Sequence, residues 1–282
     1  MIALPDFFSR LLDEPRYLVR ALVAAAVLVF CLVKYLQSRR EAKGEYYTEA
    51  EMESFDAAAQ EALGPCGCVM HEKVSPDIHV DILMIPPGEH CPFYTLCTMG
   101  VGAHRMNVPP VDEQKLKDGE YLPDFRPLVF PGWDRVELMM YLPAEWVPLW
   151  MKEDATGEEK DNSYWPILWM KHFARFMVHS GTWYAFGHTL NPEEDLGYDK
   201  EYCAFVLASP LPDCTRPGFT LKAGDKDVSV LQLVPLTEKE YLSALQGKPT
   251  EWVKEFLPGT PEEMREFLAE RVQRMGVVPR KS

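Results

Sequence analysis

Positive charge is scarce in this sequence of 282 residues. It has 29 lysine and arginine residues against 43 aspartate and glutamate residues, which gives a formal net charge of −14 at pH 7. Because proteins bind nucleic acids through basic residues that displace counterions, this balance excludes nucleic acid as a partner class. An acidic surface suits a basic protein partner. The alternative is that the charge only maintains solubility.

A regular disulfide framework is also absent, because the seven cysteine residues are scattered along the chain. Their scatter favours a reducing compartment. The tightest group, Cys66-Gly-Cys68 followed by His71, lacks the second pair of ligands that a structural zinc site needs. The sequence therefore predicts no metal and no cofactor.

Only one long hydrophobic run is present. Its uncharged core covers residues 21–33, and flanking tyrosine and basic residues extend it to 17–36, close to the ~20 residues that cross a bilayer. We therefore predict a leader at 1–16, a single-pass transmembrane anchor at 17–36 and a linker at 37–47. The denser basic group after the run predicts that the following domain is cytoplasmic. The alternative is a buried helix of that domain.

The remaining residues, 48–282, are predicted to form one globular domain. Strands mixed with flanking helices, without strict alternation of the two, favour an α+β fold with a mixed β-sheet. A threonine three residues before a glutamate is the pattern of an N-terminal capping box. This pattern predicts three helix starts: Thr48 with Glu51, Thr237 with Glu240, and Thr260 with Glu263. The last helix is expected to end at Gly276.

Two hydrophobic runs, HVDILMIPP and RVELMMYLP, alternate with the period of two that is typical of strands. EYCAFVLASP and DVSVLQLVPL predict further strands. In the first two runs, alternate residues are expected to share a face of the sheet: Val80, Ile82 and Met84 against Asp81, Leu83 and Ile85, and Val136, Leu138 and Met140 against Glu137, Met139 and Tyr141.

The segment WPILWMKHFARFMVHSG predicts a helix, because Pro166 suits a first turn and Gly181 suits a C-terminal cap. Its aromatic residues recur at spacings of four and three, which places them on one helix face. This stripe predicts a face packed in the core and not a cofactor site: Trp165, Trp169, Phe173 and Phe176.

The segment YTLCTMGVGAHRMNVP contains two glycines where a strand-like run ends. A phosphate-binding loop would be followed by a helix, whereas here Pro109 and Pro110 favour extended structure. Gly100 and Gly102 are therefore predicted to turn the chain sharply. We predict that the next four residues contact a protein partner: His104, Arg105, Met106 and Asn107. The alternative is a packed turn that only closes the sheet.

A catalytic alternative can be built from a thiol and a histidine base. It would use Cys91 or Cys97 with one of three histidines: His104, His172 and His188. The alternation of YTLCTMG instead predicts that Cys97 packs inside a sheet. The carboxylate groups at 158–159 and 193–195 lie in polar stretches and are expected to be solvated. No catalytic residue is predicted.

Several motifs resemble the suppressor-of-fused domain family, in order from about residue 71 to 245. They are HVDILMIPPGEHCPFYTLCTMGVGAHRMNVPP, RVELMMYLPAEW, WPILWMKHFARF, GTWYAFGHTL, YCAFVLASP and VLQLVPLTEKE. The resemblance implies a compact protein-binding domain without catalytic residues or a cofactor. Animal members clamp a peptide of a transcription factor between two lobes, and bacterial relatives look like immunity proteins that neutralise a toxin.

This chain has little sequence after Leu245 for a second lobe, so it resembles the bacterial, single-lobed type. The expected function is a non-catalytic protein-binding module tethered to a membrane, with a basic toxin as one candidate partner. The alternative function is a Cys/His-dependent hydrolase or a metal-binding enzyme.

Overall fold

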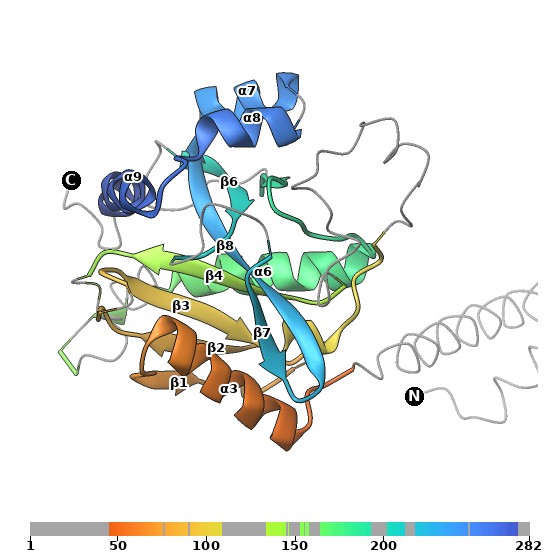
Figure 1. Cartoon of the computed structure of the whole chain (residues 1–282). Helices are drawn as coiled ribbons and strands as arrows, with labels where there is room; N and C mark the ends of the chain where they lie inside the picture. Colours follow the sequence, from red (N-terminus) through yellow and green to blue (C-terminus); the bar gives the residue numbers. More distant parts are fainter. Residues whose placement is uncertain are drawn as a thin grey trace, which may run out of the picture. The chain divides into compact units, whose positions relative to one another are not determined.

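The structure is a computed structural model, and Figure 1 shows the arrangement of its elements. The described ranges are 45–108, 134–146, 153–192, 202–211 and 218–275, apart from residues 76, 90, 145, 155, 158–163 and 248. The predicted leader, the anchor and most of the linker lie outside these ranges. Within them, no helix is both long and apolar enough to span a membrane.

Eight strands of the described chain form one mixed sheet in the order β1-β2-β3-β4-β8-β6-β5, and β7 also pairs with β8. β4 and β8 run parallel, whereas the other neighbours are antiparallel. The strands are β1 Cys68–Met70, β2 Asp81–Ile85, β3 Tyr94–Met99, β4 Val136–Leu142, β5 Thr189–Leu190, β6 Tyr202–Ala208, β7 Thr220–Ala223 and β8 Lys226–Thr237. The predicted mixed sheet is confirmed.

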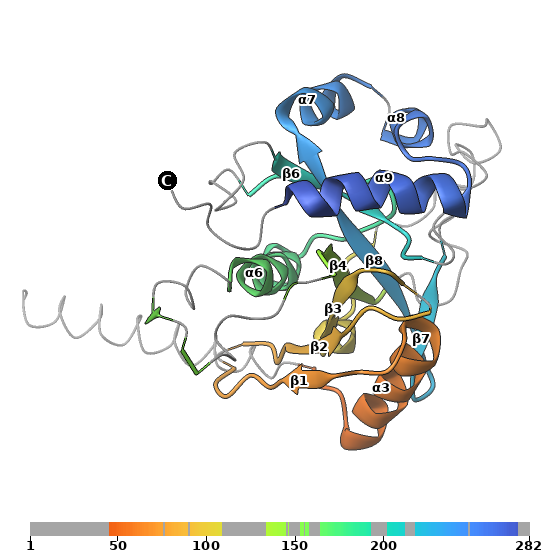
Figure 2. The same ribbon diagram turned by 90° about the vertical axis from the view of Figure 1, so that its left-hand side faces the viewer.

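Helices cover both faces of this sheet. The helices are α3 Glu49–Leu63, the 3-10 helix η1 Val101–Ala103, α6 Trp165–Ser180, α7 Glu238–Gln246, α8 Pro249–Phe256 and α9 Pro261–Arg274. α6 packs on one core cluster, whereas α3, α8 and α9 contribute to the other. Figure 2 shows α6 and α3 on opposite sides of the sheet. The α+β class that the element order predicts is therefore confirmed.

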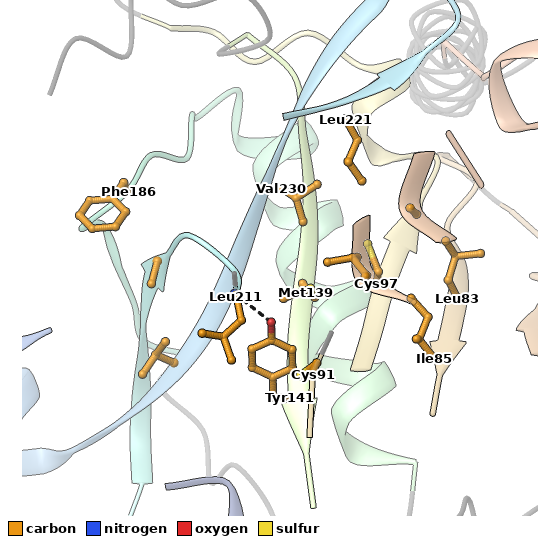
Figure 3. Packing of buried hydrophobic residues seen from close by; sticks show 14 of the residues in the cluster. Leu83, Ile85, Cys91, Cys97, Met139, Tyr141, Phe186, Leu211, Leu221 and Val230 are labelled. Carbon is orange, nitrogen blue, oxygen red and sulfur yellow. Dashed lines mark hydrogen bonds between the residues drawn. The ribbon is translucent and has the colours of Figure 1, made fainter. Parts of the chain in front are cut away.

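The predicted alternation of the strand residues is confirmed by the two cores. Ile82 and Met84 belong to the cluster that contains α6, whereas Leu83 and Ile85 belong to the opposite cluster. Figure 3 shows this second cluster, in which Met139 and Tyr141 of β4 lie with Cys97 of β3. The period of two thus assigns each side chain to the correct face.

The predicted helix starts are also confirmed. Thr48 and Thr237 each form a capping box with the glutamate three residues later, and the Thr260 side chain accepts a hydrogen bond from the backbone N–H of Glu263. The last helix ends at Arg274, and Gly276, its predicted end, lies outside the described residues.

The aromatic stripe of α6 is only partly buried. Trp165 and Phe173 lie in the core as predicted, but Phe176 is 50% exposed. Because successive helical residues are rotated by about 100°, Phe176 points away from its buried neighbour Met177. The prediction that Phe176 is a core residue is therefore wrong.

Residues 45–47 belong to the folded domain and not to the linker. Tyr47 is buried and stacks against Phe55 of α3, with ring centroids 6.3 Å apart. The Tyr46 hydroxyl donates to the Asp77 carbonyl over 3.2 Å. These two side chains already have partners in the domain, so residues 46 and 47 are part of it.

Candidate functional site

A cavity of about 390 Å³ lies between the end of α6, the following loop with β5, and the pair α7 and α8. We call it the apolar groove. It is lined by Phe176, Thr182, Trp183, Tyr184, Gly187, His188, Thr189, Leu190, Ala244, Leu245, Gly247 and Trp252. None of these twelve residues is an aspartate, glutamate, lysine or arginine. Size and lining are those of a binding pocket for an uncharged, largely apolar group.

Exposed hydrophobic side chains gather at this groove. Phe176 and Leu245 line it with 50% and 59% of their surfaces exposed, and Leu242 of α7 is also exposed. Exposed apolar side chains grouped at a cavity mark a candidate interaction site. The groove is therefore the best candidate for a binding surface among the described residues.

β5 lies along the groove, and among the described strands it is also the last in the order of the sheet. Thr189 and Leu190 form this two-residue strand and line the groove as well. An edge strand has backbone groups that can pair with an extended segment of another chain. The groove thus combines an apolar cavity with a sheet edge.

His188 forms part of the groove wall. Its ring makes an edge-on contact with Trp183, with ring centroids 4.5 Å apart. Burial lowers the pKa of His188, which keeps the imidazole uncharged at neutral pH. The wall is therefore uncharged at this side chain as well.

The α6 wall is held by the connection between β1 and β2. Glu72 of this connection accepts hydrogen bonds from Lys171 over 3.0 Å and from Arg175 over 2.8 Å. Burial alone would raise the pKa of Glu72, but these two cationic donors lower it, so the carboxylate stays ionised. The ion pairs fix the helix that presents Phe176 to the groove.

The opposite wall is held by Arg271 of α9. Its guanidinium group donates to the Pro235 carbonyl over 2.9 Å and to Glu240 of α7 over 3.0 Å. It also lies over the rings of Phe256 and Phe267, at 4.9 and 4.1 Å from their centroids. One arginine therefore joins the three C-terminal helices, two of which line the groove.

The two glycines of YTLCTMGVGAHRMNVP surround a carboxyl group of the protein itself. The backbone N–H groups of Gly100 and Gly102 donate to Glu137 Oε1 over 2.8 and 2.9 Å. The Thr98 hydroxyl bonds to Glu137 Oε2 over 2.6 Å. The glycine N–H groups of this loop therefore bind the carboxyl group of Glu137, and the glycines need no phosphate ligand to explain them.

Each glycine is required for a different reason. Gly100 has a φ of 126°, a conformation that residues with a side chain rarely adopt. Gly102 is instead in close contact with Tyr47 and Val228, so that no side chain fits there. Gly100 thus turns the chain after β3, and Gly102 permits close packing.

The predicted contact residues after this turn differ in their exposure. Arg105 is exposed and pairs with Asp134 over 2.8 Å, and Asn107 is also exposed. His104 is partly buried, and its burial lowers the pKa of the ring. Met106 is 6% exposed and packs in the core, so it offers little surface to a partner. Arg105 and Asn107 remain as the exposed members of the predicted set.

Cys91 and Cys97 lack the environment of a nucleophile. Burial raises the pKa of the Cys97 and Cys91 thiols, which opposes thiolate formation. Cys97 bonds to the Thr98 carbonyl, and Cys91 bonds to the Thr95 hydroxyl. Among the described contacts, none joins either thiol to a histidine. The proposed thiol–histidine pairs are therefore not brought together.

The possible metal ligands are likewise occupied by the protein. The Cys66 thiol bonds to the Cys68 carbonyl over 3.1 Å, and His71 pairs with Asp81 over 2.9 Å. Within the described ranges, no group of three or more potential ligands could hold a metal ion. The paired carboxylates at 158–159 and 193–195 lie outside those ranges.

Comparisons with known proteins point to one family. The family described as "Suppressor of fused protein (SUFU)" matches residues 76–266. A SUFU homologue from Neisseria gonorrhoeae is similar in structure, with 14% identity, a TM-score of 0.44, and coverage of 74% of this chain and 90% of that chain. No curated protein matches.

Two further solved structures are similar. A chain of the Sufu–Fu complex has 13% identity and a TM-score of 0.49, with 80% of this chain and 89% of that chain covered. Drosophila Suppressor of Fused has 11% identity and a TM-score of 0.49, with 79% of this chain and 51% of that chain covered.

Proposed function

Because the chain belongs to the suppressor of fused family, we propose that it is a non-catalytic protein-binding module that holds a segment of a partner protein in the apolar groove. The observation that carries this proposal is an uncharged cavity whose rim exposes Phe176 and Leu245 beside the edge strand β5. The bound segment would insert apolar side chains into the cavity and pair its backbone with β5. One of the similar solved structures is a chain from a protein complex, the Sufu–Fu complex.

We further propose that the partner is basic, with a toxin as one candidate, and that this chain acts as its immunity protein. The formal net charge of −14 supports this choice, because complementary charge accelerates encounter. Arg105 and Asn107 are proposed as additional contacts outside the groove, since both are exposed on a turn that Glu137 holds in place.

Photo-crosslinking in cells of the native host tests the groove. A photoreactive phenylalanine analogue at Leu245 of the full chain should yield a covalent adduct with another protein, because this side chain lines the groove and is 59% exposed. The same analogue at Glu262, an exposed position of α9 outside the groove, is the matched control. Equal yields at both positions, or adducts only with a second copy of the chain, would count against the proposal. An adduct at Asn107 would add the turn to the interface.

We also propose that residues 17–36 anchor the domain to a membrane, with the domain on the cytoplasmic side. The hydrophobic run supports this proposal. Full-length protein should sediment with membranes, and a chain that lacks residues 1–43 should be soluble and folded, because it retains Tyr46 and Tyr47 with their partners. If the truncated chain aggregates while the full chain is soluble without detergent, residues 17–36 are a core helix and not an anchor.

A further inference from the structure

Glu137 of β4 is a completely buried acid that the proposed binding function does not use. Its side chain has 0% exposure, and it points to the turn formed by Gly100 and Gly102. No lysine, arginine or histidine of the described chain forms an ion pair with it. Burying an ionised carboxylate without a cation is costly, because the charge loses its hydration.

The cations near Glu137 have other partners. Arg135 donates to the carbonyls of Gly102 and Ala103, and Lys226 pairs with Glu51 over 2.7 Å. The Tyr47 hydroxyl, from the segment before α3, faces the carboxyl group and acts to lower the pKa of Glu137. The thiol of Cys97 in β3 would carry negative charge if it ionised. β8 contributes Val230, which is paired with Glu137 in the sheet.

The hydrogen bonds around Glu137 can accommodate a proton without any change of heavy-atom positions. Oε1 accepts from the two glycine N–H groups in either state. The Thr98 hydroxyl is 2.6 Å from Oε2 and 3.3 Å from the Leu138 carbonyl, so it has two possible acceptors. If Oε2 carries a proton, that proton is donated to Thr98 Oγ1 and the Thr98 hydroxyl donates to Leu138. The carboxyl group, the Thr98 hydroxyl and the two glycine N–H groups then all have partners.

We propose that Glu137 is a proton-binding site, which stays a neutral carboxylic acid in the folded domain at neutral pH and makes the turn at residues 100–102 sensitive to pH. Loss of the proton would place an uncompensated negative charge beneath the turn that presents Arg105 and Asn107. The site thereby links the protonation of one acid to the stability of the domain.

The direction of the pH effect follows from linkage. Burial raises the pKa of Glu137, although hydrogen bonding from Thr98, Gly102, Gly100 and Tyr47 acts in the opposite direction. A group whose pKa is higher in the folded state than in the unfolded state stabilises the fold at low pH. That contribution is complete below the ordinary pKa of glutamate and is lost as the pH rises through the raised value.

Infrared spectroscopy of the wild-type protein at pH 7 tests the protonation state. Ordinary glutamate and aspartate side chains titrate near about 4, so they are ionised at this pH. The proposal predicts a carboxylic acid C=O band at pH 7 that disappears in Glu137→Gln, whose amide can replace the acid O–H as a donor to Thr98. Absence of this band in the wild-type protein at pH 7 would overturn the proposal.

Urea unfolding provides the second measurement. The unfolding midpoint of the wild-type protein should fall relative to that of Glu137→Gln as the pH rises from about 6 to about 9. A constant difference between the two midpoints over this range would contradict the proposal.

If Glu137→Gln does not fold, infrared spectroscopy of Thr98→Val takes its place. The carboxylic acid C=O band should then shift relative to the wild-type band, because the hydrogen-bond acceptor of the acid is removed. An unchanged band would overturn the assignment to Glu137.

Discussion

Replacing Gly102 with valine should destabilise the domain by about 3 kcal/mol or more, among the largest losses expected for a single substitution. A Cβ atom at this position would collide with the Tyr47 hydroxyl and would lie 2.6 Å from Val228 Cγ1. Tyr47 and Val228 are themselves buried, so neither can move without displacing its neighbours. Thermal melting should show a decrease of roughly 6 to 12 °C.

Gly88→Val is the matched control for Gly102→Val. A Cβ atom at Gly88 would have no neighbour within 4 Å, and this residue is exposed. Its stability should change by no more than about 0.5 kcal/mol. Equal melting temperatures for the two variants would mean that Gly102 is not packed as described, and the account of the turn would then be wrong.

The local features of this fold could be predicted from the sequence because they depend on near neighbours. The alternation around Ile82 and Leu83 identified both faces of β2, and Thr237 with Glu240 marked the start of α7. Each of these signals involves residues that are at most a few positions apart. Short elements escaped prediction: β5 has two residues, and α8 has eight residues.

The turn around Glu137 and the apolar groove both depend on contacts between distant segments, which no local sequence pattern encodes. Gly102 and Glu137 are 35 positions apart, and only the pairing of β3 with β4 brings them together. The one available signal was a single acid within the apolar run VELMMYL of β4. The apolar groove likewise combines α6 with α7 and α8, so the exposure of Phe176 could not be deduced from its helix alone.

The same exposure allows Phe176 to be changed without damage to the fold. Phe176→Lys should keep its melting temperature within a few degrees, because half of the side chain is already in solvent and a cation is tolerated near a helix C-terminus. Binding of the protein recovered by crosslinking should weaken at least ~100-fold, or ~2.7 kcal/mol. The lysine would place a charge in an uncharged cavity and would also repel a basic partner.

Leu168→Lys is the matched control, since Leu168 lies on the same helix and is 54% exposed but does not line the groove. The decisive measurement is the dissociation constant of the crosslinked partner for the wild-type protein, Phe176→Lys and Leu168→Lys, determined by titration calorimetry. The account predicts an increase of at least ~100-fold for Phe176→Lys and less than about 3-fold for Leu168→Lys. A folded Phe176→Lys protein that binds the partner as tightly as the wild-type protein would contradict the claim that the apolar groove is the binding site.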